Sequence, residues 1–208
     1  ITDIELKPDK PLAKTCGDCV ICIDACPTGA IVAPYVINSG LCISFLTIEL
    51  RGSIPRKLRP LMGDWIFGCD ICQDVCPVNR KTEPDMDPAF RQQHDFAAPT
   101  LVPLLDLTDE GFRRKFKNSP IRRAKKTGLQ RNVCVALGNI GDRSSTPALV
   151  KTLRSPDPVL REHAAWALGK LGGHEAIVAL STALAKETNQ SVYREIELSL
   201  ADMSPTDT

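Results

Sequence analysis

The 208-residue sequence predicts a mainly α-helical protein in which a small cysteine-rich domain precedes a short α-solenoid. Three observations lead to this fold class. Eight of the nine cysteines lie within the first 76 residues, among many glycines and prolines. The segment after residue 128 is rich in Ala and Leu and repeats a helical pattern. Aromatic residues make up only 5% of the chain, which is few for a β-sandwich but usual where helices pack through small residues.

Composition places the chain among globular proteins. Hydrophobic residues account for 43% and charged residues for 25%, which excludes a disordered chain. No apolar run approaches the roughly 20 residues of a membrane span, and the first residues do not resemble a signal peptide. We therefore expect a cytoplasmic monomer without membrane contact. The missing initiator Met suggests a processed chain or a piece of a longer one.

Composition also divides the chain into three parts. We expect a cysteine-rich domain over residues 1–80, an irregular linker over 81–127 and helical repeats over 128–208. The linker is polar and is interrupted by prolines, namely Pro84, Pro88, Pro99, Pro103 and Pro120.

The cysteines form two motifs of matching spacing. The first is Cys16-x2-Cys19-x2-Cys22-x3-Cys26-Pro27, and the second is Cys69-x2-Cys72-x3-Cys76-Pro77. The second lacks a cysteine at Ile66, for which Cys42 can substitute. In the bacterial ferredoxin pattern each run gives three thiolates to one cubane and its last cysteine to the other. The spacing thus predicts two 4Fe–4S clusters, one held by Cys16, Cys19, Cys22 and Cys76 and one by Cys26, Cys42, Cys69 and Cys72.

Other uses of the cysteines fit less well. An odd number of cysteines without a secretory signal is a poor disulfide framework. Zinc usually takes paired C-x2-C units separated by a longer loop, so a third closely spaced cysteine would be redundant. Cys134 falls on the apolar face of a repeat helix, where we expect a buried small side chain. Trp65 and Phe67 flank a predicted cluster, and we expect them to shield it from water.

The C-terminal part repeats itself. The segment 131–141 realigns with 161–172 at an offset of 30 residues, and Arg194 begins a weaker third copy. Second helices are expected over 147–153 and 175–184. The segment Ser155-Pro156-Asp157-Pro158 should supply a cap and a first-turn proline for the helix of the second copy. Leu160, Ala164 and Leu168 then fall on one helical face. Two helices per unit indicate short HEAT-type repeats.

A run of positive charge precedes the repeats, although the whole chain has a net charge of only +1. No acidic residue interrupts it, and Phe112 and Phe116 lie within it. Such asymmetry favours a docking face for a polyanion over a solvated linker, without separating RNA from DNA. The cations of the run are Arg113, Arg114, Lys115, Lys117, Arg122, Arg123, Lys125, Lys126 and Arg131.

The three histidines, His94, His163 and His174, are isolated in the sequence. We expect each of them to be a core or surface residue.

These motifs together resemble the C-terminal portion of the epoxyqueuosine reductase family. The resemblance covers about residues 9–171 and is far more specific than a bare ferredoxin motif. It is carried by Cys16-Gly17-x-Cys19, Asp24-Ala25-Cys26-Pro27-Thr28-Gly29-Ala30-Ile31, Leu46-Thr47-Ile48-Glu49, the segment 63–77, Ser119-Pro120-Ile121-Arg122-Arg123-Ala124-Lys125 and Arg131-Asn132.

The resemblance implies reduction of the epoxide on a modified base at the tRNA wobble position, with electrons from an external donor passing through the clusters to cobalamin. It implies that Ser44, Thr47, Glu49 and Arg51 lie on the cobalamin and substrate side. It also implies that the tRNA anticodon stem-loop meets Arg122, Arg123, Lys125, Lys126 and Arg131. The family's other half binds most of the cobalamin and carries the proton donor, so no catalytic residue is named and this chain alone should not complete catalysis.

Two other functions are also compatible with the sequence. One is a stand-alone two-cluster electron-transfer protein whose repeats form a docking scaffold for another protein. The other is a related corrinoid enzyme such as a reductive dehalogenase, although the basic segment and the repeats argue against it. Salt-sensitive binding of a tRNA stem-loop would distinguish the tRNA-modifying reductase from the electron-transfer protein, which should not bind the stem-loop.

Overall fold

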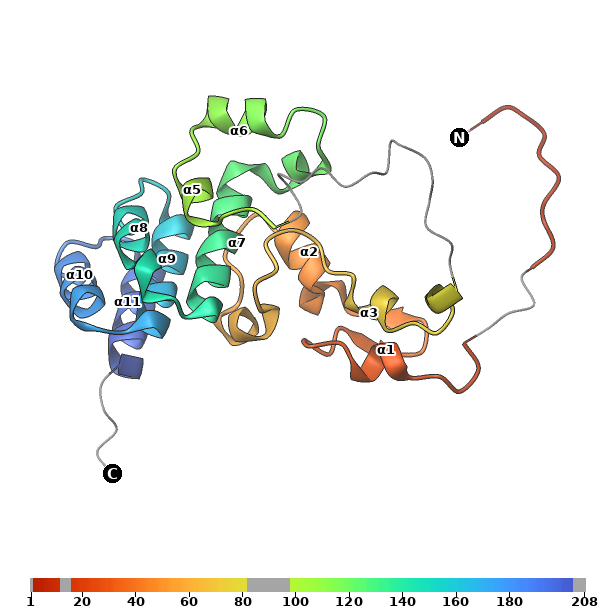
Figure 1. Ribbon diagram of the computed structural model, residues 1–208, viewed down its shortest axis with the longest axis horizontal. Coiled ribbons are helices and arrows are strands. Elements are labelled where there is room, and N and C mark those ends of the chain that lie inside the picture. Colours follow the sequence, from red (N-terminus) through yellow and green to blue (C-terminus); the bar gives the residue numbers. More distant parts are fainter. Residues whose placement is uncertain (1, 12–15, 82–97, 204–208) are drawn as a thin grey trace.

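The computed structural model describes residues 2–11, 16–81 and 98–203. The described chain is mainly helical, and the predicted fold class is confirmed. Part of the expected linker, with Pro84, Pro88 and His94, lies outside the described residues. Figure 1 shows the cysteine-rich part at one end of the molecule and the repeats at the other, with helix α7 (Lys125–Ile140) between them. Among the described residues, no helix is both long and apolar enough to cross a membrane.

The cysteine-rich part is built from two short helices and a hairpin. Helices α1 (Ile21–Asp24) and α3 (Ile71–Asp74) lie side by side (Figure 1). Strands β1 (Ile31–Ala33) and β2 (Val36–Ile37) pair antiparallel, and Tyr35 takes a positive φ of 63° at their turn. Short 3₁₀ helices η1 (Ser39–Leu41) and η3 (Asn79–Lys81) complete this part. The two cysteine motifs thus fold into equivalent loop–helix turns.

The repeats form two layers of helices. Helix α7 packs against α9 (Pro158–Leu171), and α9 packs against α11 (Gln190–Met203). Helices α8 (Thr146–Thr152) and α10 (His174–Leu184) lie beside α9 and fill the positions expected for the second helices. As expected, Asp157 caps α9, its Oδ1 accepting from the Val159 amide at 2.9 Å. The 3₁₀ helix η6 (Arg143–Ser145) leads into α8.

Two glycines set the spacing of the repeat helices. A Cβ on Gly138 would lie 2.7 Å from the Trp166 ring, and one on Gly169 would lie 2.7 Å from the Ser199 Cβ. Because neither glycine has a side chain, the neighbouring helices approach closely.

The ends of the repeat helices give the length of the repeat. Gly141 and Gly172 end α7 and α9 at positive φ, and their separation in sequence is one residue longer than that between Arg131 and Arg161. The predicted offset of 30 is therefore one residue short.

The start of the first repeat helix also differs from the prediction. Helix α7 begins at Lys125, three residues before the expected start of the repeats. It follows helices α5 (Val102–Leu105) and α6 (Asp109–Lys115) and the 3₁₀ helix η5 (Pro120–Ala124). The basic segment therefore has regular structure along most of its length.

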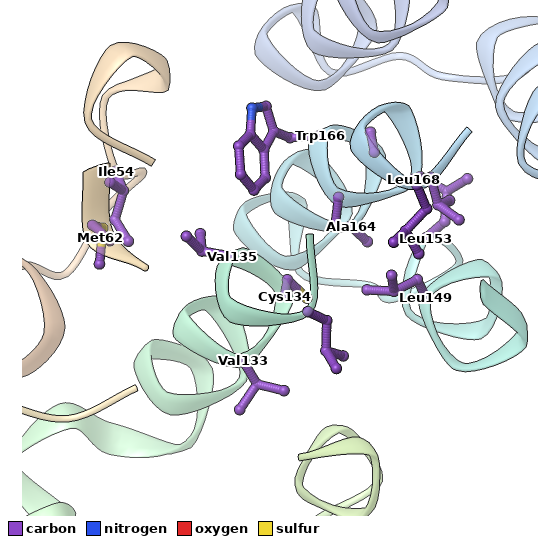
Figure 2. Packing of buried hydrophobic residues seen from close by; sticks show 14 of the residues in the cluster. Ile54, Met62, Val133, Cys134, Val135, Leu149, Leu153, Ala164, Trp166 and Leu168 are labelled. Atoms are coloured by element: carbon purple, nitrogen blue, oxygen red, sulfur yellow. The ribbon is translucent and has the colours of Figure 1, made fainter. Parts of the chain in front are cut away.

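One apolar core joins the repeats to the chain between the two cysteine motifs, residues 43–68, here called the insertion. The insertion contains α2 (Ile43–Ile48) and the 3₁₀ helix η2 (Arg56–Met62). Ile54 and Met62 are fully buried in the same cluster as Trp166 of α9. Figure 2 shows these insertion residues across from Trp166, with Cys134 of α7 inside the helical core. Cys134 is fully buried, as predicted.

Candidate functional site

The first cysteine motif folds into a tight turn. Cys22 lies on α1, Gly17 and Gly29 take positive φ, and Cys26 follows the helix. The Ala30 amide donates to the Cys26 Sγ at 3.2 Å. Burial raises the pKa of Cys26, but hydrogen bonds from the Thr28 hydroxyl and nearby amides outweigh it and bring this pKa below its ordinary value. Amides aimed at a sulfur stabilise a thiolate ligand.

The second motif repeats this geometry. Cys42 precedes α2, Cys69 follows Gly68 at a positive φ of 77°, and Cys72 lies on α3. Burial raises the pKa of Cys69, and charge repulsion from Cys42, Cys72 and Cys26 raises it further. These are the four cysteines that the sequence assigns to one cluster. Burial raises the pKa of Cys72, and charge repulsion from Cys22, Cys42 and Cys26 raises it further. The two motifs face one another, because helices α1 and α3 lie side by side.

The chemistry of this donor set fits iron–sulfur clusters. Within the described part of the chain, no group of three or more His, Cys, Asp or Glu residues is close enough to hold one metal ion. A cubane places each of its four cysteines on a separate iron, so its ligands need not converge on one point. Soft thiolates that repel one another are stabilised by the positive charge of iron. The individual ligand assignments remain predictions.

The residues expected on the cobalamin and substrate side do not share one environment. Ser44 is partly buried, while the Arg51 side chain is exposed and donates to the Ile48 carbonyl at 2.9 Å. The Glu49 carboxylate pairs with Arg123 and lies 3.9 Å from Arg51. Thr47 is fully buried, and its hydroxyl and carbonyl are both hydrogen-bonded inside the protein. The prediction is therefore wrong for Thr47, which cannot contact a ligand at the surface.

Most of the predicted tRNA-facing cations are accessible. Arg122, Arg123 and Lys125 are exposed, and the partly buried Lys126 donates to Asp109 at 2.9 Å. Lys125 takes φ 62° and ψ 167° where η5 meets α7. For a residue with a side chain this backbone is strained, and it turns the chain sharply in the middle of the basic segment.

Arg131 is the exception among these cations. Its side chain is 1% exposed, and its guanidinium donates to the carbonyls of Leu46 at 2.6 Å, Leu50 at 2.9 Å and Gly52 at 2.6 Å. Burial, followed by the charges of Arg51 and Arg59, lowers the pKa of Arg131 to about 10, which still leaves it charged at neutral pH. Its assignment to tRNA is wrong, because the side chain is buried and its guanidinium is occupied by backbone carbonyls of the protein.

The two phenylalanines of the basic segment are also internal. Phe112 and Phe116 are buried, and their ring centroids lie 5.1 Å apart at an interplanar angle of 57°. They hold α6 against the core and cannot stack on nucleic-acid bases. The aromatic residues therefore give no support to nucleic-acid binding. The prediction of nucleic-acid binding therefore rests on the exposed cations.

Sequence reasoning missed a buried ionic network that joins the insertion to the repeats. Arg59 of η2 is 1% exposed and donates to Glu162 of α9 at 2.5 Å and to Glu195 of α11 at 2.9 Å. Its Nε donates to the Ile54 carbonyl at 2.9 Å, and its guanidinium lies 5.9 Å from the Trp166 ring centroid. The only signal in the sequence was the length of the insertion, which exceeds what a minimal ferredoxin needs.

Polar side chains of the repeats also hold the insertion's backbone. Asn139 of α7 donates to the carbonyls of Arg59 at 2.8 Å and Gly63 at 2.7 Å. His163 of α9 is fully buried, and its Nε2 accepts from the Ile54 amide at 3.1 Å. Burial, then repulsion from Arg59, holds the pKa of His163 well below its usual value, so the ring is neutral. Of the two alternatives expected for each histidine, core or surface, His163 is a core residue.

Comparison with known proteins agrees with both parts of the chain. Residues 15–79 match the family described as a 4Fe-4S double cluster binding domain, and residues 121–201 match HEAT repeats. Epoxyqueuosine reductase of Bacillus subtilis is 39% identical over 198 residues, which is 95% of this chain and 51% of that protein. Epoxyqueuosine reductase of Escherichia coli is 42% identical over 170 residues, covering 82% of this chain and 45% of that protein.

A solved structure shares the fold. The crystal structure of an epoxyqueuosine reductase with an epoxyqueuosine-modified tRNA-Tyr stem loop is 38% identical, with a TM-score of 0.89. The match covers 95% of this chain and 52% of that one, so the chain spans about half the length of each epoxyqueuosine reductase named here. The cysteine turns, the repeats and this similarity together show that the chain belongs to the epoxyqueuosine reductase family.

Proposed function

We propose that this chain is the cluster-bearing and tRNA-contacting part of an epoxyqueuosine reductase, acting on tRNA in the cytoplasm as a monomer. In this proposal the cluster domain spans residues 1–80, the linker 81–127 and the repeats 128–208. When bound, the two 4Fe–4S clusters would relay single electrons from an external donor to cobalamin, which would supply the reducing chemistry. The supporting observation is that one chain carries two facing cysteine turns and an exposed basic segment.

The basic segment is the proposed binding surface for the anticodon stem-loop. Arg122, Arg123, Lys125 and Lys126 come from η5 and the first turn of α7, directly beside the end of α2. Phosphates bind such cations without regard to base sequence. Ser44, Glu49 and Arg51 remain proposed for the cobalamin and substrate side, since they lie on or just after α2. The Glu49–Arg123 ion pair connects these two surfaces.

Salt-dependent binding tests this proposal. In Arg122→Glu/Lys125→Glu, the affinity for an anticodon stem-loop should fall, and the slope of log K against log salt should flatten by about 0.7–0.9 for each lost phosphate contact. Arg154→Glu/Lys186→Glu is the matched control, because it makes the same change of charge at two exposed residues in the turns after α8 and α10. Equal affinities for the two variants would refute the assignment of this surface. A wild-type chain that binds no stem-loop would favour the stand-alone electron-transfer protein.

A further inference from the structure

We propose that Asn132 of α7 is a positioning residue for the second predicted cluster, because it joins the two backbone segments that carry Cys42 and Cys69. The inference rests on the proposed function, in which these cysteines ligate a cluster. It goes beyond that function by giving a residue of the repeats a role in cluster retention.

The Asn132 amide spans the gap between the two segments. Its Nδ2 donates to the Thr47 carbonyl at 2.8 Å and to the Ile66 carbonyl at 2.9 Å. Thr47 lies on α2, which begins directly after Cys42, and Ile66 lies three residues before Cys69. Asn132 is fully buried. One side chain of the first repeat helix therefore fixes the chain near both cysteines.

The Thr47 hydroxyl makes a second connection between the same segments. Its Oγ1 accepts from the Gly68 amide at 3.0 Å and donates to the Ile43 carbonyl at 2.8 Å. Gly68 directly precedes Cys69, and Ile43 directly follows Cys42. A longer contact joins the same hydroxyl to the Ser44 carbonyl at 3.3 Å. The two shorter bonds thus end at the residues next to the two cysteines.

Arg131 fixes the orientation of the Asn132 amide. The Asn132 Oδ1 accepts from the Arg131 Nε at 3.1 Å and Nη2 at 2.8 Å. Since the oxygen is held by two donors, both N–H groups of the amide face the carbonyls of the insertion. Arg131 also binds three carbonyls at and beyond the end of α2, as described above. The pair therefore holds the path of the chain after Cys42.

These hydrogen bonds would affect the cluster by fixing the positions of its cysteine ligands. Outer hydrogen-bonding partners orient ligands, and their loss typically weakens metal binding about 10–100-fold. Hydrogen bonding and solvent exposure also set cluster potentials. Loss of the Asn132 bonds would free Thr47 and Ile66, and with them the spacing of Cys42 and Cys69. The other predicted cluster takes no ligand from these segments, so the effect should be selective.

Asn139 provides a matched control on the same helix. It also uses one amide to bind two carbonyls of the insertion, those of Arg59 and Gly63, about two turns further along α7. Its contacts lie away from both cysteines in sequence. Asn132→Ala and Asn139→Ala therefore remove the same kind of anchor, but only the first touches the segments that carry cluster ligands.

The experiment measures iron release to a chelator from anaerobically reconstituted protein, together with the electron paramagnetic resonance of the reduced clusters. The phase that is absent from Cys42→Ala identifies the second cluster. In Asn132→Ala this phase should become about tenfold faster and the signal of this cluster should change. Asn139→Ala should leave both unchanged, even if its thermal stability falls. Equal acceleration in both variants, or none in Asn132→Ala, would overturn the inference.

Variants of Thr47 keep the test decisive if Asn132→Ala does not fold. Thr47→Val removes the hydroxyl and keeps the shape of the side chain, whereas Thr47→Ser keeps the hydroxyl. Faster iron release in the first and a normal rate in the second support the inference, and equal rates contradict it. A wild-type chain that binds no iron would refute the proposed function itself, which is a distinguishable result.

Discussion

Replacing Arg59 with methionine should destabilise the chain by about 4 kcal/mol, because it removes the cation that two buried carboxylates, those of Glu162 and Glu195, share. Arg59 is almost completely buried, and its guanidinium binds Glu162, Glu195 and the Ile54 carbonyl. Methionine fills much of the same volume without a charge. The variant thus tests the ionic contacts rather than a cavity.

The expected loss of stability depends on the hydrogen-bonding partners that Glu162 and Glu195 keep in the variant. Breaking a buried ion pair by removing one partner costs about 3–5 kcal/mol. Glu195 retains Arg56, whose Nε donates at 2.9 Å, and Glu162 retains the Ser53 hydroxyl at 2.6 Å. Because each carboxylate keeps one of these partners, the expected loss in the free energy of unfolding stays within that range and does not reach twice its size. The Ile54 carbonyl adds about 1 kcal/mol as an unsatisfied acceptor.

Urea unfolding followed by circular dichroism measures the effect, with the wild-type chain and each variant at equal cluster loading. Arg56→Met is the control, because Arg56 is 34% exposed and its second partner, Asp202, is 52% exposed. This change should cost about 1 kcal/mol or less. An Arg59→Met variant as stable as Arg56→Met would refute the claim that the Arg59 network joins the insertion to the repeats.

Two further predictions concern the packing and the acid stability of the repeats. Gly138→Ala should destabilise by about 1–3 kcal/mol in a thermal melt, because its Cβ would meet the Trp166 ring at 2.7 Å. Gly128→Ala on the same helix has room, with its nearest neighbour at 3.9 Å, and should be neutral or stabilising. The unfolded chain protonates His163 near pH 6.5 whereas the folded chain does not, so stability should fall by about 1.4 kcal/mol per pH unit below that value. His163→Gln should flatten this slope in melts between pH 7.5 and 5, roughly the range around that ordinary pKa, whereas a slope lost equally in His174→Gln would contradict it.

The cysteine turns and the repeats could be predicted because their signals are local. Four cysteines within eleven residues permit few backbone paths, and the second motif repeats the spacing of the first. The helix of the second copy was visible from Asp157-Pro158 at its start and from apolar residues on one face. Here local chemistry and the final fold agree.

The contacts across the molecule could not be predicted because they join residues far apart in sequence. Arg131 has the same identity as the exposed cations before it, and only the fold shows that it points at the carbonyls of α2. From the sequence, Phe112 and Phe116 could likewise stack on nucleic-acid bases, but in the fold both side chains are buried in the core. Arg59 meets Glu162 and Glu195 across more than 100 residues, and no spacing rule connects them.

The proposed function requires that the two cysteine turns, together with Cys42, hold two iron–sulfur clusters. The most direct test is to measure iron, acid-labile sulfide and zinc per chain after anaerobic reconstitution, with electron paramagnetic resonance of the reduced protein. We expect about eight irons per chain, a matching amount of sulfide and signals from two interacting 4Fe–4S clusters. One or two zinc ions without sulfide would contradict it and would make this part of the chain a structural metal scaffold.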